Sequence, residues 1–438
     1  MKAHQQEFKF QDGSLLEEIC AEGTLRKAFK LVKRNKGAPG IDGITIADFE
    51  QNLSEELTQL KQEVLSWKYK PTPVKRVEIP KPDGKGVRLL GIPIIKDRVL
   101  HMAIKMVLEP ILDPDFSKSS YGFRPEKNQQ QAVEAAREYV RAGKEFIVDI
   151  DLSKFFDRIN HDRLIHRLGS KIEDKRVLRL IGMILRSGIM TNGTVTILHE
   201  GSVQGSPLSP LLSNLVLDEL DKELEERNLE FCRYADDCNI FVKTERSAVR
   251  VMESIKKFIE TKLKLKVNEE KSKVAKSDQV KFLGMTIVNG FIAISKKAIN
   301  KAMETVKVLI PRGSHQPIEK AIDQINIWYN GWASYFKMTQ YPAQLAAIEA
   351  HIRRRLRARF VKQQKRRRNL YHKLIKLGVG KKLGAKTVYS NKGHWNLSHT
   401  RAVEKAFSNK WFEKVGLKIV SNLGLKHWLP VNKWVKLV

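Results

Sequence analysis

Two short apolar runs enclose a pair of acidic residues near the middle of the chain. The runs cover residues 229–232 and 239–242, and the tetrapeptide Tyr-Ala-Asp-Asp, residues 234–237, stands between them. β-prone runs on either side of such a turn predict a hairpin with both aspartates at its tip. Upstream, residues 146–152 alternate well enough to predict another strand, with Asp151 at its end.

Longer segments repeat their apolar residues every three or four positions, which predicts helices. The predicted helices cover residues 15–33, 97–112, 128–142, 176–187 and 246–263. Two predicted strands, residues 74–79 and 87–95, flank a basic turn. After residue 295 the strand pattern ends, and residues 296–309, 317–335 and 342–364 predict three helices. This order predicts an α+β fold followed by a helical domain.

Positive charge is concentrated towards the end of the chain. The 438 residues carry a net charge of +31 and are 42% hydrophobic, enough for two or three domains. Residues 350–438 hold 24 lysines and arginines against two acids, Glu404 and Glu413. A polyanionic partner is therefore expected, most strongly for this part. A membrane-surface segment is disfavoured because residues 353–359 contain too few apolar side chains, and a localisation signal would be much shorter.

Cysteine usage and hydropathy indicate the cellular compartment in which the protein is expected. Cys20, Cys232 and Cys238 form no Cys-x-x-Cys pair, so neither a zinc site nor a disulfide framework is predicted. Buried thiols in a reducing cytosol are expected, which places the protein in the cytoplasm. No apolar run approaches the length of a membrane span, and the first residues lack the apolar core of a signal peptide. No membrane partner is expected.

Carboxylates from the two predicted β elements would meet at one point. An acid at a strand end, beside a hairpin that carries two more, gives three oxygen-rich side chains around one site. Mg²⁺ prefers hard oxygen ligands and takes the rest from water and substrate phosphates. Two such ions can hold the attacking and departing oxygens of nucleotidyl transfer. Solvated acids at a strand-to-helix junction are the alternative. It stays open for Asp149 and Asp157, so only Asp151 is assigned to the site.

A loop rich in glycine, serine and proline, residues 200–210, lies between the two acidic elements. It opens onto the periodic apolar run 211–217, which predicts a helix. Glycine lets the backbone approach a substrate closely, and a helix N-terminus lies behind it. Most such loops are only turns, so the position between the acids is what makes this one a candidate for substrate contact.

The order of these motifs resembles the reverse transcriptases encoded by group II introns of bacteria and organelles. The core of the resemblance is Asp-x-x-x-x-Phe at 151–156, Gln-Gly-x-Pro-x-Ser-Pro at 204–210, and the Tyr-Ala-Asp-Asp string. Matching segments also lie at residues 35–43, 79–88, 120–125 and 281–284, so the resemblance covers almost the whole chain. One departure stands out: the family commonly has Pro-Gln-Gly-Gly where residues 203–206 are Val-Gln-Gly-Ser.

The resemblance implies a right-hand polymerase fold of fingers, palm and thumb, with a helical thumb or maturase domain and a basic C-terminal tail. The implied domains are an N-terminal extension with fingers (1–90), a fingers and palm catalytic domain (91–290), a thumb and maturase-specific domain (291–380) and a DNA-binding-like tail (381–438). The implied activity is RNA-directed DNA polymerisation with two Mg²⁺ ions, for which Mn²⁺ could substitute.

The resemblance also assigns roles to individual residues. The catalytic acids would be Asp151, Asp236 and Asp237, and these together with Leu152 would be the metal-binding positions. The incoming nucleotide would contact Lys81, Arg88, Phe156 and Gln204, and Phe156 would exclude a ribose 2′-hydroxyl. The primer end would be held by Phe282, Leu283 and Gly284. RNA would be bound by Arg353, Arg354, Arg355, Arg366, Arg367 and Arg368.

The implied partners are intron RNA, an RNA template with a DNA primer, target DNA and dNTPs, with the protein a monomer or homodimer in the bacterial cytoplasm. The protein would assist splicing and retrohoming by target-primed reverse transcription. No cysteine pair or matching histidine cluster follows residue 380, so an endonuclease domain is not expected. Two alternatives stay open: a defence-associated or otherwise domesticated reverse transcriptase, and a splicing-only RNA-binding maturase.

Overall fold

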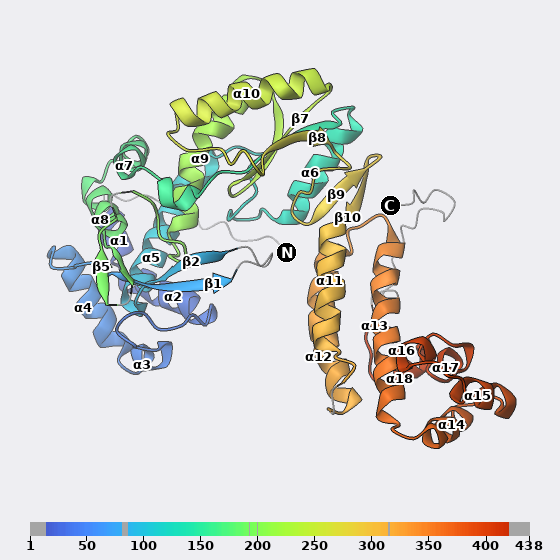
Figure 1. Cartoon of the computed structure of the whole chain (residues 1–438). Helices are drawn as coiled ribbons and strands as arrows, with labels where there is room; N and C mark the ends of the chain where they lie inside the picture. The colour runs from blue at the N-terminus through green and yellow to red at the C-terminus, as the bar shows by residue number, and fades with distance from the viewer. Residues whose placement is uncertain (1–14, 81–85, 192, 199, 314–315, 420–438) are drawn as a thin grey trace, which may run out of the picture. The chain divides into compact units, whose positions relative to one another are not determined.

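The computed structural model describes residues 15–80, 86–191, 193–198, 200–313 and 316–419. The chain divides into two compact units, which Figure 1 shows in ribbon form. Unit 1 consists of Met1–Tyr139 and Gly143–Ala275, and unit 2 consists of Val140–Ala142 and Lys276–Val438. Lys81, a candidate nucleotide contact, lies outside the described residues.

An antiparallel sheet carries the acidic motifs of unit 1. Strand β7 (Asp237–Val242) lies between β6 (Glu230–Tyr234) and β3 (Phe146–Ile150). The predicted hairpin and the predicted upstream strand are therefore confirmed. Helix α10 (Glu245–Thr261) packs against β3 and β7, as Figure 1 shows, and shields their apolar side chains from water.

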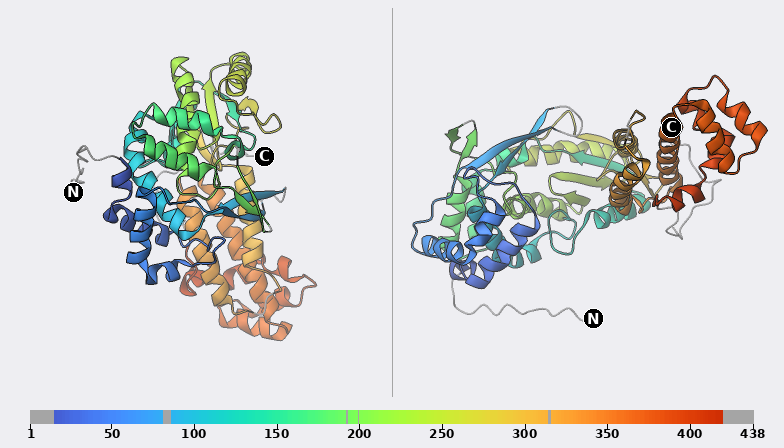
Figure 2. Two further views of the ribbon diagram at one scale, coloured as in Figure 1. Left: turned by 90° about the vertical axis from the view of Figure 1, so that its left-hand side faces the viewer. Right: turned by 90° about the horizontal axis from the view of Figure 1, so that it is seen from below.

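A second sheet of unit 1 contains β1 (Val74–Pro80), β2 (Val87–Ile92), β4 (Ile189–Thr191) and β5 (Thr194–Thr196). β1 and β2 form the predicted hairpin, which extends away from the N-terminal helices in every view (Figure 1 and Figure 2). β2 ends before its predicted limit because the next residue, Pro93, has no N–H for the ladder. β1 also pairs in parallel with β4, which no local pattern predicts.

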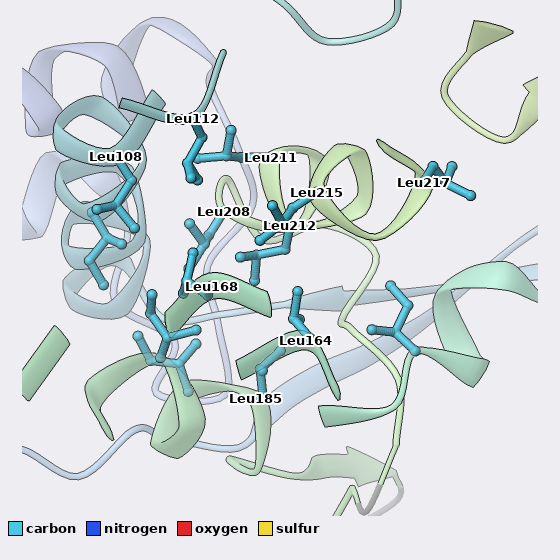
Figure 3. Close-up of a cluster of buried hydrophobic side chains, with 14 of the residues drawn as sticks. Leu108, Leu112, Leu164, Leu168, Leu185, Leu208, Leu211, Leu212, Leu215 and Leu217 are labelled. Carbon is cyan, nitrogen blue, oxygen red and sulfur yellow. The ribbon is translucent and has the colours of Figure 1, made fainter. Parts of the chain in front are cut away.

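Leucines from four helices form the centre of the unit 1 core. The helices are α5 (Ile95–Leu112), α7 (His161–Gly169), α8 (Lys175–Leu185) and α9 (Ser209–Glu226). Figure 3 shows their side chains gathered together: Leu108, Leu112, Leu164, Leu168, Leu185, Leu211, Leu212 and Leu215, with Leu208 from the loop before α9. Burying one leucine contributes about 1.5–3 kcal/mol. This packing fixes the start of α9 and the loop that precedes it.

The remaining helices before β3 are α1 (Leu15–Ile19), α2 (Glu22–Arg34), α3 (Ile46–Gln51), α4 (Leu53–Leu65) and α6 (Gln129–Arg141). One continuous helix was predicted where α1 and α2 are separate. Helix α1 buries Leu16 and Ile19, whereas α2 packs against α5 and buries Leu25, Phe29 and Val32 at helical spacing.

Unit 2 is helical after one hairpin, β9 (Met285–Val288) with β10 (Phe291–Ile294). The three predicted helices are confirmed as α11 (Lys296–Leu309), α12 (Ile318–Phe336) and α13 (Pro342–Gln363). Up to residue 419, where the described part ends, shorter helices follow: α14 (Arg367–Lys376), α15 (Lys381–Val388), α16 (His394–Leu397), α17 (Arg401–Ala406) and α18 (Asn409–Lys414).

Candidate active site

The β6–β7 turn places one of the two hairpin aspartates at its tip. Tyr234 pairs directly with Asp237, so only Ala235 and Asp236 lie in the turn. Ala235 has a φ of 56°, in the left-handed region that favours glycine, so neighbouring contacts must hold it there. The prediction is therefore correct for Asp236, whereas Asp237 is the first residue of β7 and is exposed.

A fully buried arginine fixes this turn. Arg233 donates to both carboxylate oxygens of Asp221, over 2.7 Å and 2.5 Å, and neither side chain is exposed. It also donates to the carbonyl oxygen of Ala235 over 2.9 Å, to Ser120 Oγ over 2.7 Å and to Asn214 Oδ1 over 3.1 Å. Burial alone would lower the pKa of Arg233, but the Asp221 carboxylate outweighs burial and raises it. The arginine is therefore a permanent cationic support behind the turn.

The Ser-Tyr-Gly-Phe-Arg-Pro segment, residues 120–125, packs directly on the same turn. A Cβ added to Gly122 would lie 2.3 Å from the backbone nitrogen of Ala235, so only glycine fits. The Gly122 carbonyl accepts from Asn214 Nδ2 over 2.8 Å, and the Tyr121 N–H donates to the Arg233 carbonyl over 2.8 Å. This segment therefore has a definite task in unit 1, which is to support the hairpin that carries Asp236.

Asp151 follows β3 at the end of the sheet where the turn lies, because Ile150 pairs with Cys238. Its backbone is held from both directions. The Asp151 N–H donates to Ser272 Oγ over 3.0 Å, and its carbonyl accepts from the Asn268 N–H over 2.8 Å. The turn of residues 268–272 thus sets the position of this carboxylate.

Asp236 lies in the field of a second carboxylate and of two cations at this end of the sheet. Burial, together with the negative charge of Asp151, raises the pKa of Asp236, while Arg88 and Lys271 act in the opposite direction. Lys271 Nζ lies 3.5 Å from Asp151 Oδ1. Arg88 is among the predicted nucleotide contacts. Lys271 is not, because one lysine in a lysine-rich segment gives no signal without its spatial neighbours.

The carboxylate pair suits a hard divalent cation. A buried carboxylate beside a second negative charge is stabilised by a cation placed between them. Among the residues whose positions are described, no group of three or more Asp, Glu, His or Cys side chains could hold a metal ion by itself. The expected three-carboxylate cluster is therefore not assembled by the protein alone. One or two carboxylates with substrate phosphates are nevertheless the usual Mg²⁺ set, so Asp151 and Asp236 fit.

The other two predicted metal-binding residues, Asp237 and Leu152, are placed less directly for metal binding than Asp151 and Asp236. Asp237 is the first residue of β7 and is exposed, whereas Asp236 lies in the turn that precedes it. Its part in metal binding stays a prediction. The Leu152 side chain is apolar and 6% exposed, so only its backbone carbonyl could reach a metal.

A cavity of about 180 Å³ brings together two of the predicted nucleotide contacts. Phe156 and Gln204 both line it, with Gly91 of β2 and Ser202 among their neighbours. The preceding residue, Phe155, is 3% exposed and belongs to the core. Of these two adjacent rings, Phe156 is therefore the one that lines the cavity, and its contact with a nucleotide stays a prediction.

The Gln204 loop is attached to the fingers hairpin through backbone. The Gly91 N–H donates to the Gln204 carbonyl over 2.7 Å. Gly205 has a φ of 123°, and a Cβ there would lie 2.3 Å from the Gly91 carbonyl oxygen, so position 205 requires glycine. These backbone contacts fix the loop that carries Gln204 against β2, the strand that carries Arg88.

The candidate primer-grip residues form a tight turn in unit 2. Phe282 and Met285 exchange two backbone hydrogen bonds of 2.9 Å, and Leu283 and Gly284 between them have φ values of 51° and 83°. The Tyr335 hydroxyl of α12 donates to the Leu283 carbonyl over 2.7 Å. Phe282 is 7% exposed, so its ring anchors the turn from inside. A grip on a primer would use the backbone of the turn.

The six candidate RNA-binding arginines lie in two places, three on α13 and three at the start of α14. The prediction needs correction for Arg355. Arg355 is buried, and its guanidinium donates to the Ile310 carbonyl over 2.8 Å and to the Lys307 carbonyl over 3.2 Å. It therefore closes the C-terminal end of α11 and is not available to RNA. The run of arginines had suggested one exposed face, but α13 is packed on several sides.

The other five differ in exposure. Arg353 pairs with buried Glu349 over 3.7 Å, and Arg354 stacks on Trp395 at 4.1 Å from the ring centre. Arg366, Arg367 and Arg368 are exposed at the start of α14. Arg367 also donates to the Val388 carbonyl over 2.8 Å and to the Ser390 carbonyl over 2.6 Å, so Arg366 and Arg368 remain the best placed to meet a phosphate backbone.

Comparison with known families agrees with this geometry. The family described as reverse transcriptase (RNA-dependent DNA polymerase) matches residues 79–287. The group II intron maturase-specific domain matches residues 299–377.

Individual relatives point the same way. Protein YkfC of Escherichia coli K12 is 33% identical over 315 residues, covering 63% of this chain and 82% of that protein. Group II intron-encoded protein LtrA of Lactococcus lactis is 30% identical over 355 residues, covering 65% of this chain and 59% of LtrA. Among solved structures, a partial Cas6-RT-Cas1–Cas2 complex is 26% identical, covers 57% of this chain and 43% of its own, and has a TM-score of 0.37, too low to carry an argument.

The family match over residues 79–287 identifies the class as RNA-directed DNA polymerases, and the sheet that carries Asp151 and Asp236 lies within that range. Within that class, the chain belongs to the reverse transcriptases of group II introns that carry a maturase-specific domain. The reverse transcriptase match assigns it reverse transcription, and the maturase-specific match implies binding of intron RNA. No helix within the described ranges is both long and apolar enough to cross a membrane.

Proposed function

We propose that Asp151 and Asp236 hold the Mg²⁺ ions with which this chain adds dNTPs to a DNA primer on an RNA template. The observation that carries the proposal is the position of these two carboxylates at one end of the sheet, where Lys271 Nζ also lies 3.5 Å from Asp151 Oδ1. Two bound ions would stabilise the attacking primer 3′-oxygen and the departing pyrophosphate, and Mn²⁺ could replace them.

The protein's own residues bind and orient the substrates. Arg88 supplies a fork of donors for the triphosphate, and Lys271 supplies a point charge next to Asp151. Lys81 is assigned the same task as Arg88 from the resemblance. Phe156 lines the cavity and would meet a 2′-hydroxyl, which favours dNTPs over NTPs. Gln204 holds the base pair being formed. Proximity then supplies much of the rate.

Unit 2 binds the nucleic-acid partners. The maturase-specific match and the exposed arginines 366–368 support binding of the intron RNA, and the turn at residues 282–284 supports contact with the primer end. In the cell we infer a cytoplasmic protein, monomer or homodimer, that assists splicing. We also infer that it inserts its intron at a target DNA by target-primed reverse transcription.

Primer extension with matched variants tests the assignment. We would follow cDNA synthesis on a primed RNA template with Mg²⁺ in wild type, Asp151→Asn and Asp236→Asn. Asp162→Asn is the control, because its side chain is 87% exposed and makes only a surface ion pair with Arg186. Loss of extension is expected in the two site variants alone, with binding of intron RNA retained. Near-normal extension by folded Asp236→Asn would show that the metal site is misassigned. Intron binding by a wild-type protein without extension would support the splicing-only maturase.

A further inference from the structure

Two buried histidines hold the loop that carries Gln204, one on each side of it. His101 on α5 is 4% exposed, and its Nδ1 lies 2.9 Å from Ser206 Oγ. His161, the first residue of α7, is 2% exposed, and its Nε2 donates to the Gly201 carbonyl over 2.6 Å. Gln204 lies between these two points of attachment.

The hydrogen-bond partners define what each ring does. A carbonyl can only accept, so His161 carries its proton on Nε2. The Ser206 hydroxyl accepts from the Leu208 N–H over 3.3 Å, which leaves its own proton for His101 Nδ1. Burial lowers the pKa of His101 to about 3 and also lowers that of His161, so both rings are neutral at working pH.

The same loop is bonded to the other nucleotide-binding elements. Its Ser202 N–H donates to the Phe156 carbonyl over 2.6 Å, and the Gly201 N–H donates to the Ile159 carbonyl over 2.7 Å. The histidines therefore hold a segment whose backbone is hydrogen-bonded to the Phe156 turn and to strand β2. A small shift of the loop would move Gln204 relative to the cavity that both side chains line.

We propose that His101 and His161 are positioning residues that hold Gln204 against the incoming nucleotide. The proposal rests on the proposed function, in which Gln204 and Phe156 contact that nucleotide. Neither histidine lines the cavity, so each acts through the loop.

The test uses the fact that the two histidines bond through different nitrogens. An asparagine amide lies near the position of Nδ1, and a glutamine amide reaches the position of Nε2. His101→Asn and His161→Gln should therefore stay near wild type. His101→Gln, His161→Asn and Ser206→Gly should raise the KM for dNTP roughly tenfold with kcat within about twofold, because a lost buried hydrogen bond acts on the bound nucleotide through the loop. The assay is single-nucleotide addition by the full chain at saturating primed template.

Stability and coupling measurements separate this role from a merely structural one. If every histidine variant lowers kcat and the unfolding temperature together while the KM for dNTP stays constant, the histidines only stabilise the fold and the proposal is wrong. In a Gln204→Ala background the disruptive changes should raise KM no further, and additive effects would also overturn it. Both results would leave extension by wild type intact. A wild type that cannot extend primers would instead remove the proposed function, and this proposal with it.

Discussion

The buried ion pair behind the catalytic turn gives the sharpest prediction for unit 1. Replacing Arg233 by methionine leaves the Asp221 carboxylate buried without its partner. Removing one member of a fully buried pair costs about 3–5 kcal/mol, because the remaining charge keeps its desolvation penalty and loses its compensation. We therefore expect Arg233→Met to lower the free energy of unfolding of unit 1 by that amount.

A matched surface pair provides the control. Arg227 pairs with Glu223 one helical turn away on α9, with 34% of its side chain exposed, so Arg227→Met should cost under about 1 kcal/mol. Denaturant titration followed by circular dichroism measures the loss, and hydrogen exchange of the β6 and β7 amides assigns it to the hairpin. Equal losses for Arg233→Met and Arg227→Met would refute the reasoning.

A double variant separates stability from catalysis. Arg233→Met with Asp221→Leu removes both buried charges, and apolar replacements of similar size often restore stability. The Ala235 carbonyl would still lack its donor, so the turn that carries Asp236 could shift. A displacement of about 1 Å at a catalytic group costs on the order of a hundredfold in rate. We expect recovered stability with slow primer extension. Full recovery of both would mean that Arg233 serves stability alone.

Three further predictions address other parts of the chain. Phe156→Ala should raise ribonucleotide over deoxyribonucleotide incorporation in a competition assay, whereas Phe155→Ala should leave the ratio unchanged and cost about 3–5 kcal/mol of stability. Burial raises the pKa of Asp97 from 3.8 to about 6, so the folded state holds this proton more tightly than the unfolded chain does. In urea titrations the stability of wild type relative to Asp97→Asn should therefore fall by roughly 3 kcal/mol between about pH 3 and pH 7, and parallel pH profiles would contradict the assignment. Glutamine at all three positions 366–368 should weaken RNA binding and flatten its salt dependence by roughly 0.7 per lost contact. Arg355→Gln should instead lower stability with an unchanged slope.

Local patterns were sufficient for the β6–β7 and β1–β2 hairpins of unit 1 and for the three long helices of unit 2. Helix α11 has the limits that its apolar spacing predicts, and α12 and α13 differ from prediction by single residues at their ends. Helices α11 and α12 bury one face, so periodicity and structure carry the same information there, whereas α13 is packed on several sides. The short helices α14–α18 were not predicted, because each is too brief to show a period among its lysines and arginines.

Buried polar residues were the part of the site that no local pattern could supply. Arg355 reads as one of a run of surface charges, yet its partners are carbonyls 45 and 48 positions earlier in the chain. His101 and Ser206 are 105 positions apart, and Ser272 lies 121 positions from Asp151. Charged and polar residues are mostly exposed, so each of these looks ordinary until the fold supplies its partner.

Two sets of supporting contacts, here called frames, hold different parts of the unit 1 site. They should affect different steps of the reaction. One frame holds the acid at the hairpin tip, through Arg233 and the segment of residues 120–125. The other joins Gln204 to strand β2 and to the two histidines, and so governs the nucleotide. Damage to the first frame should slow the chemical step, whereas damage to the second should weaken dNTP binding. Comparing kcat and KM for Arg233 and histidine variants at equal stability would show whether the two frames are independent. If they are one cooperative unit, both parameters should change in every variant.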